Sequence, residues 1–120
     1  MFSRSFFVFL CTLKLLFATS LSGATILNPG FENNLNDWVD IDPSTPSSSD
    51  VHSGSKSAKI TGAGGWIGQT INVSQNTDYI LKAWVLDKGI VGVDVGGSDF
   101  SDGGDFASFT EVSLPFNSGS

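Results

Sequence analysis

Two apolar runs separated by a polar break dominate the pattern of hydrophobic positions along the chain. In residues 65–73 the larger side chains alternate with glycine, threonine and asparagine, and in residues 79–86 apolar residues alternate with a set that includes Lys82 and Trp84. A period of two is typical of strands that have one face in a core. The break at residues 74–78 is rich in turn-forming residues, so we predict that the two runs form an antiparallel pair.

Trp84 is the exception in this pattern. If Tyr79 and Leu81 face the core, then Ile80, Lys82 and Trp84 share the opposite face. A tryptophan on an outer face is costly to leave in water unless another part of the protein or a ligand covers it. We therefore expect this face to carry the function.

The remaining segments predict further strands and two loops. Strands are predicted at residues 25–27, 58–61, 90–95 and 106–116. Pro, Ser, Thr and Asp in residues 42–50, and Gly, Ser and Asp in residues 96–105, predict surface loops. With six strands and no helical period, the chain is predicted to be all-β, with the turn spacing of an antiparallel β-sandwich.

The N-terminal residues have the pattern of a secretory signal peptide. Arg4 supplies a positive start, residues 6–16 supply an apolar run, and residues 22–24 are small and suited to cleavage. An uncleaved membrane anchor is the alternative, although the run is short and a lysine interrupts it. We predict a signal peptide at residues 1–24, one domain at residues 25–120, secretion, and no membrane contact after cleavage.

Composition narrows the classes of function. Residues 25–120 keep four lysines against twelve carboxylates, a net charge of −8, and without a basic cluster we expect no nucleic-acid binding. Cys11 belongs to the predicted signal, which excludes disulfides and cysteine nucleophiles from the remaining domain. His52 is the single histidine and has no partner in a catalytic motif, so it is predicted to be a turn residue. No pair of carboxylates has a distinctive setting, and we predict no catalysis.

An ordered set of motifs resembles a known family. The set comprises NPGFE at 28–32, Trp38, HSGSKSAKI at 52–60, Trp66 with Gln69, NTDYILKAWV at 76–85 and FTEVSLPFNSGS at 109–120. It resembles the CenC-like carbohydrate-binding modules, which are jelly-roll β-sandwiches of the galactose-binding-like superfamily. The runs SGSKSAKITG, VGVDVGGSDF and SLPFNSGS look most like the modules attached to secreted bacterial alginate lyases.

The resemblance implies a non-catalytic module that is normally tethered to a catalytic domain and binds polysaccharide. Family members continue after the FNSGS segment with one or two strands, so the resemblance also implies a sandwich that lacks its last strands here. Two alternatives remain open at this point. One is a structural or adhesive β-sandwich at the cell surface, and the other is the N-terminal fragment of a secreted alginate lyase.

Trp66 and Trp84 are the main binding candidates, because the flat C–H faces of sugars stack on aromatic rings. The alternative for either ring is a place in the core. Gln69, Lys82 and Asp94 are candidates for hydrogen bonds to sugar hydroxyls or carboxylates, and Lys82 is the cation that a uronic-acid polymer requires. The alternative for these three is an ordinary solvated face, which we favour for Asp94. We predict alginate or a similar polysaccharide as the ligand.

The resemblance further implies a structural calcium ion. Similar modules hold calcium between a glutamate, the carbonyl of a glycine two residues earlier, a carbonyl from an SGS-type turn, and an aspartate from the last strand. The first three map to Glu32, Gly30 and Ser55. Hard oxygen ligands on turns suit calcium. The alternative is that the Glu32 carboxylate caps a turn.

Overall fold

The computed structural model describes residues 2–10, 13–19, 24–41, 44–60 and 65–120. Within these ranges all regular structure is strand, and every neighbouring pair of strands runs antiparallel. The predicted all-β antiparallel class is therefore confirmed. The described residues contain no helix that is long and apolar enough to cross a membrane. The strands are β1 (Phe2–Leu10), β2 (Leu13–Thr19), β3 (Val39–Ile41), β4 (Ser44–Ser47), β5 (Ser57–Ile60), β6 (Gly65–Val73), β7 (Asp78–Val95) and β8 (Ser98–Asn117).

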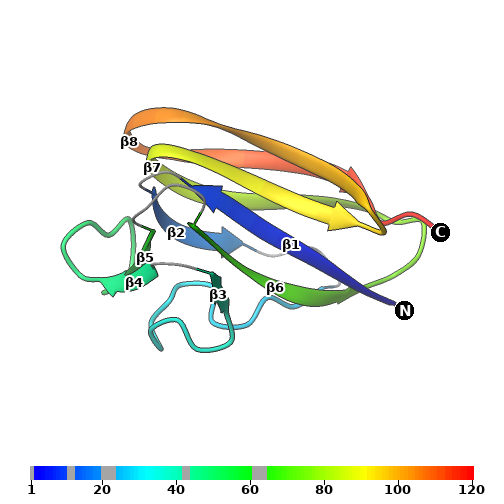
Figure 1. The fold of residues 1–120 in the computed structure, drawn as a ribbon, viewed down its shortest axis with the longest axis horizontal. Helices are drawn as coiled ribbons and strands as arrows, with labels where there is room; N and C mark the ends of the chain where they lie inside the picture. Colours follow the sequence, from blue (N-terminus) through cyan, green and yellow to red (C-terminus); the bar gives the residue numbers. More distant parts are fainter. Residues whose placement is uncertain (1, 11–12, 20–23, 42–43, 61–64) are drawn as a thin grey trace.

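One continuous sheet forms two layers, because the long strands β7 and β8 each bend near the middle (Figure 1). The first half of β7 pairs with β2 and the second half with β1. β8 pairs with β7 on both sides of the bend. One layer continues from β1 to β6 and β3, and the other continues from β2 to β5 and β4. This arrangement is consistent with a partial β-sandwich.

The bend itself depends on backbone geometry that few residues tolerate. Asp87 has a φ of 63°, and the pairing of β7 with β8 shifts register between Val85 and Asp87. Just beyond the bend, a Cβ on Gly103 would overlap the carbonyl oxygen of Gly89. Glycine is needed at 103 because the two backbones approach too closely for a side chain.

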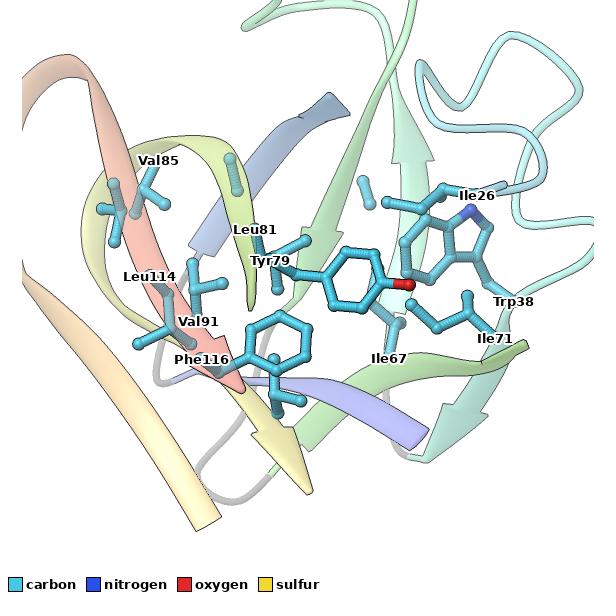
Figure 2. Close-up of a cluster of buried hydrophobic side chains, with 14 of the residues drawn as sticks. Ile26, Trp38, Ile67, Ile71, Tyr79, Leu81, Val85, Val91, Leu114 and Phe116 are labelled. Carbon is cyan, nitrogen blue, oxygen red and sulfur yellow. The ribbon is translucent and has the colours of Figure 1, made fainter. Parts of the chain in front are cut away.

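The core lies between the two layers and is built by alternate residues (Figure 2). Burial alternates with a period of two in β6, β7 and β8, which confirms the predicted one-sided burial of residues 65–73 and 79–86. Trp38 is also buried and packs against Phe31, with 5.0 Å between ring centroids. The buried residues of the long strands are Ile67, Ile71, Val73, Tyr79, Leu81, Ala83, Val85, Val91, Val93, Val95, Val112, Leu114 and Phe116.

The predicted pairing of residues 65–73 with residues 79–86 is wrong. β6 pairs with β1 and β3, whereas the first half of β7 lies in the other layer. The polar break at residues 74–78 therefore connects one layer to the other. β6 and the first half of β7 face the same core from opposite sides. Side chains hold this crossing: the Tyr79 hydroxyl accepts from Ser74 N at 2.9 Å, and the Ser118 hydroxyl accepts from Thr77 N at 2.9 Å.

Three local predictions also differ from the structure. Residues 25–27 are not a strand, residues 98–105 form the first part of β8, and β4 lies within the predicted loop at 42–50. The loop at 96–105 shrinks to a tight turn because Gly96 and Gly97 have φ values of 61° and 91°, which suits a two-residue hairpin.

β1 and β2 fall within the predicted signal peptide. The backbone of β1 lies between β6 and β7, and that of β2 lies between β5 and β7. Ser22, Gly23 and Cys11 lie outside the described residues. Cleavage and secretion stay predictions.

Candidate functional site

The side of β7 and β8 that points away from the core carries a continuous set of exposed and half-buried side chains, which we call the outer face. The pairings are Ile80 with Pro115, Lys82 with Ser113, and Trp84 with Glu111. Ile80 is 49 % exposed, and the Lys82 side chain is 44 % exposed. The predicted placement of Ile80, Lys82 and Trp84 on one face is confirmed. The outer face consists of Ile80, Lys82, Trp84, Phe109, Glu111, Ser113 and Pro115.

Three rings gather at one end of the outer face, and we call them the aromatic cluster. His52 stacks on Trp84 with 3.9 Å between ring centroids and an interplanar angle of 18°. Phe109 meets the same imidazole edge-on, at 5.7 Å and 65°. Trp84 is half-buried and His52 is exposed. The outer-face tryptophan is thus covered by another part of the protein, and its cover is itself open to solvent.

The Glu32 carboxylate anchors the segment that carries His52. Its Oε1 accepts from Ser55 N at 2.8 Å and from Lys56 N at 3.2 Å, and its Oε2 accepts from the Ser55 hydroxyl. Gly54, with a φ of 68°, passes so close that a Cβ there would overlap this carboxylate. We call residues 51–57 the His52 loop.

These hydrogen bonds also change the acidity of Glu32. The Ser55 hydroxyl is the main cause that lowers the pKa of Glu32, followed by the Ser55 amide, with further help from the Lys56 amide and charge. Each of these groups stabilises the ionised form. The carboxylate therefore stays charged to a lower pH than an ordinary glutamate, and its hydrogen bonds hold the His52 loop.

Charge on the outer face is nearly balanced. Lys82 Nζ lies 3.9 Å from Glu111 Oε1, and both side chains are more than one-third exposed. A pair at this distance and exposure is weak because water screens it. The Lys82 ammonium can therefore exchange Glu111 for a ligand carboxylate or hydroxyl at small cost.

The end of the outer face opposite to the aromatic cluster borders a hollow of about 500 Å³. Ile80 and Pro115 line it together with Asp78, Asn117 and the core-facing residues Tyr79 and Phe116. The Asn117 amide donates to Asp78 Oδ1 at 2.8 Å.

The structure does not bring Trp66, Gln69 or Asp94 to the outer face. Trp66 is half-buried on β6, in the other layer. Gln69 is 8 % exposed, and its amide accepts from Leu27 N at 2.9 Å and donates to Leu27 O at 3.0 Å. Asp94 accepts from Gly97 N at 2.8 Å and so closes the β7–β8 turn. The side chains of Gln69 and Asp94 are hydrogen-bonded to backbone groups. Trp66 lies on a strand of the other layer, away from the outer face.

Glu32 and Ser55, two of the three predicted calcium ligands, do lie together. Three hydrogen bonds from the turn occupy the carboxylate, which leaves about one of its four lone pairs for a cation. The described residues contain no group of three or more His, Cys, Asp or Glu side chains that could hold a metal ion. This arrangement fits the alternative of a carboxylate that caps a turn, and calcium stays a prediction.

Sequence reasoning missed His52 and Phe109. His52 is predicted to be a turn residue and lies in a bend of the chain, but no local pattern connects it to Trp84, 32 positions later. Phe109 is in phase with the outward residues Glu111 and Ser113, opposite to Val112 and Leu114, but its place beside Trp84 depends on the pairing of β8 with β7.

A comparison with family models finds a match to the carbohydrate binding domain over residues 23–99. That range includes Trp84 and His52 and begins after β1 and β2. Comparisons with curated proteins and with solved structures find no match. Because the match covers more than half of the 120 residues, the chain belongs to the carbohydrate binding domain family.

Proposed function

We propose that the protein binds polysaccharide through the outer face of β7 and β8. The observation that carries this proposal is the aromatic cluster on an exposed sheet face. Trp84 offers a flat apolar ring, and Lys82 lies two positions away on the same side of the strand. Sugars present apolar C–H faces beside polar hydroxyls, so a ring flanked by polar groups matches their chemistry.

Alginate or a similar uronic-acid polymer is our first choice of ligand. Lys82 supports it, since its ammonium is only weakly held by Glu111 at 3.9 Å and can pair with a uronate. The acidic balance of the whole chain, −6, opposes a polyanion at long range. Affinity for alginate would therefore rest on local contacts or on bridging cations.

Secretion and tethering complete the proposal. The signal-like pattern of residues 1–24 supports export, and the resemblance to lyase-associated modules supports attachment to a catalytic domain. A tethered module raises the local concentration of its enzyme on the substrate without doing chemistry itself.

Titration calorimetry with alginate, a glucan and a mannan tests the proposal. We expect saturable binding of at least one of these, and we expect Trp84→Ala to weaken it about tenfold or more, as for a central aromatic contact. Trp66→Ala is the matched control, because that ring lies in the other layer. Thermal melts of both variants report whether the fold survives.

The results separate the proposal from its alternative. Loss of binding in Trp84→Ala with retained folding supports the outer face as the glycan site. No binding of any polysaccharide by the folded protein would contradict it and favour a structural or adhesive role. Equal loss in both variants would place the site elsewhere.

A further inference from the structure

We propose that the face of Trp84 covered by His52 is a subsite for one pyranose ring, and that the free protein closes this subsite with its own imidazole. The inference rests on the proposed function and adds to it: binding requires His52 to leave Trp84. His52 is then the residue that sets how readily the outer face accepts a sugar.

The geometry makes the two occupants mutually exclusive. The imidazole lies 3.9 Å from the indole and only 18° from parallel, which is van der Waals contact between the two rings. A sugar that stacks on the same indole face needs the same contact distance. Either the imidazole or the pyranose can lie there, but not both.

Phe109 adds a second contact for the ring that covers Trp84. It meets the imidazole edge-on at 5.7 Å and 65°. A flat ring with an apolar face suits this place because it can stack on Trp84 and still contact Phe109. The ligand class that fits is therefore a polysaccharide that can present the apolar face of one pyranose ring.

The imidazole of His52 can leave Trp84 while the hydrogen bonds that hold the His52 loop stay in place. Glu32 holds the loop through Ser55 and Lys56, and the Ser57 hydroxyl donates to Asp50 O at 2.7 Å. The Glu32 contacts lie after His52 in the sequence, with Ser53 and Gly54 between them. Rotation at the exposed His52 can uncover Trp84 while these anchors remain.

Removal of the imidazole should raise affinity. A protein whose binding-competent state is partly closed loses apparent affinity in proportion to the closed fraction. The interaction free energy of an aromatic pair of this kind corresponds to a change of about 2- to 12-fold in the equilibrium between the closed and open subsite. We expect His52→Ala to bind an alginate or glucan oligosaccharide about 2- to 12-fold more tightly than the parent chain.

Two further variants make the comparison specific. His52→Phe keeps a flat ring over Trp84 and should give no gain in affinity. Ser53→Ala changes the neighbouring exposed residue of the His52 loop and should also give no gain. A gain in all three would indicate general loosening of the loop and would overturn the inference.

A measurement without glycan tests the closed state directly. Ring protons of His52 should show an upfield NMR shift from the Trp84 indole in the full chain, and the shift should disappear in Trp84→Ala. Its absence in the parent chain would overturn the inference, because the subsite would already be open.

The failure of this inference and the failure of the proposed function look different. If Trp84→Ala abolishes binding but His52→Ala binds no more tightly, the outer face stands as the glycan site and the closure by His52 is wrong. If Trp84→Ala binds the oligosaccharide as tightly as the parent chain does, the proposed site on the outer face is wrong, and so is the subsite on Trp84.

Discussion

Glu32 holds the His52 loop through hydrogen bonds that its carboxylate accepts from Ser55 and Lys56. Its lowered pKa means that ionised Glu32 is favoured in the folded chain, relative to an ordinary value of 4.5. The corresponding stability is present above pH 4.5 and is lost as the pH falls below it, through the lower folded value. We expect Glu32→Gln to lack this part of the acid dependence. Urea midpoints of both chains from pH 7 to pH 3 measure it, and parallel curves would contradict the role of Glu32.

Gln69 has a structural role in the fold, because its amide holds the backbone at Leu27. Its amide makes two hydrogen bonds with the Leu27 backbone, at 2.9 and 3.0 Å. These bonds satisfy the N–H and C=O groups of Leu27, as a neighbouring strand would. Gln69→Leu leaves both Leu27 groups without this partner and should cost about 1–3 kcal/mol. Gln75→Leu, in an exposed turn, should change stability by less than about 0.5 kcal/mol. Equal urea midpoints for the two variants would contradict this account.

Strands β7 and β8 define the architecture because each one contributes to both layers. The bend depends on the close approach of Gly89 and Gly103, where an added Cβ would meet backbone atoms. At Gly104 an added Cβ would meet the half-buried ring of Phe106 at 3.0 Å, and a side chain can shift more easily than backbone. We expect Gly103→Ala to cost about 1–3 kcal/mol and Gly104→Ala to cost less. Thermal unfolding compares them, and the reverse order would contradict the proposed packing of the bend.

Alternation in the sequence was sufficient to predict which residues in the first half of β7 face the core. It predicted Leu81 as inward and Trp84 as outward, because burial of one face imposes a period of two. Alternation does not indicate which strands lie next to each other in a sheet, and the predicted pairing of residues 65–73 with residues 79–86 is wrong for this reason. Residues 98–105 show no alternation of apolar side chains, because all of their side chains are exposed. They form a strand because their backbone pairs with β7.

The candidate site was predictable in part, for the same reason. Trp84 and Lys82 follow from the period of one strand. Glu32 and Ser55 were placed together by resemblance, and they do meet. The stack of His52 on Trp84 joins a loop to a strand across the fold, and no local pattern specifies such a contact.

At the scale of the molecule, the N-terminal strands raise a question that experiment can answer. β1 pairs with β6 from Phe2 to Leu10, and β2 pairs with β7 and β5. A chain of residues 25–120 would leave these strand edges without their present partners, which favours aggregation. A lower urea midpoint than that of the full chain, or aggregation, would contradict the predicted cleavage after residue 24. Equal midpoints would show that β1 and β2 are dispensable, as the predicted cleavage requires.

The three tryptophans allow one measurement to locate the glycan site. Each indole gives its own NMR signal, and the three lie in different settings: Trp84 on the outer face, Trp66 in the other layer, and buried Trp38 with Nε1 2.9 Å from Asn28 O. The full chain would be titrated with alginate and glucan oligosaccharides. We expect the Trp84 indole signal to move saturably while those of Trp66 and Trp38 stay in place. Movement of Trp66 alone, or of none with either oligosaccharide, would contradict binding at the outer face of β7 and β8.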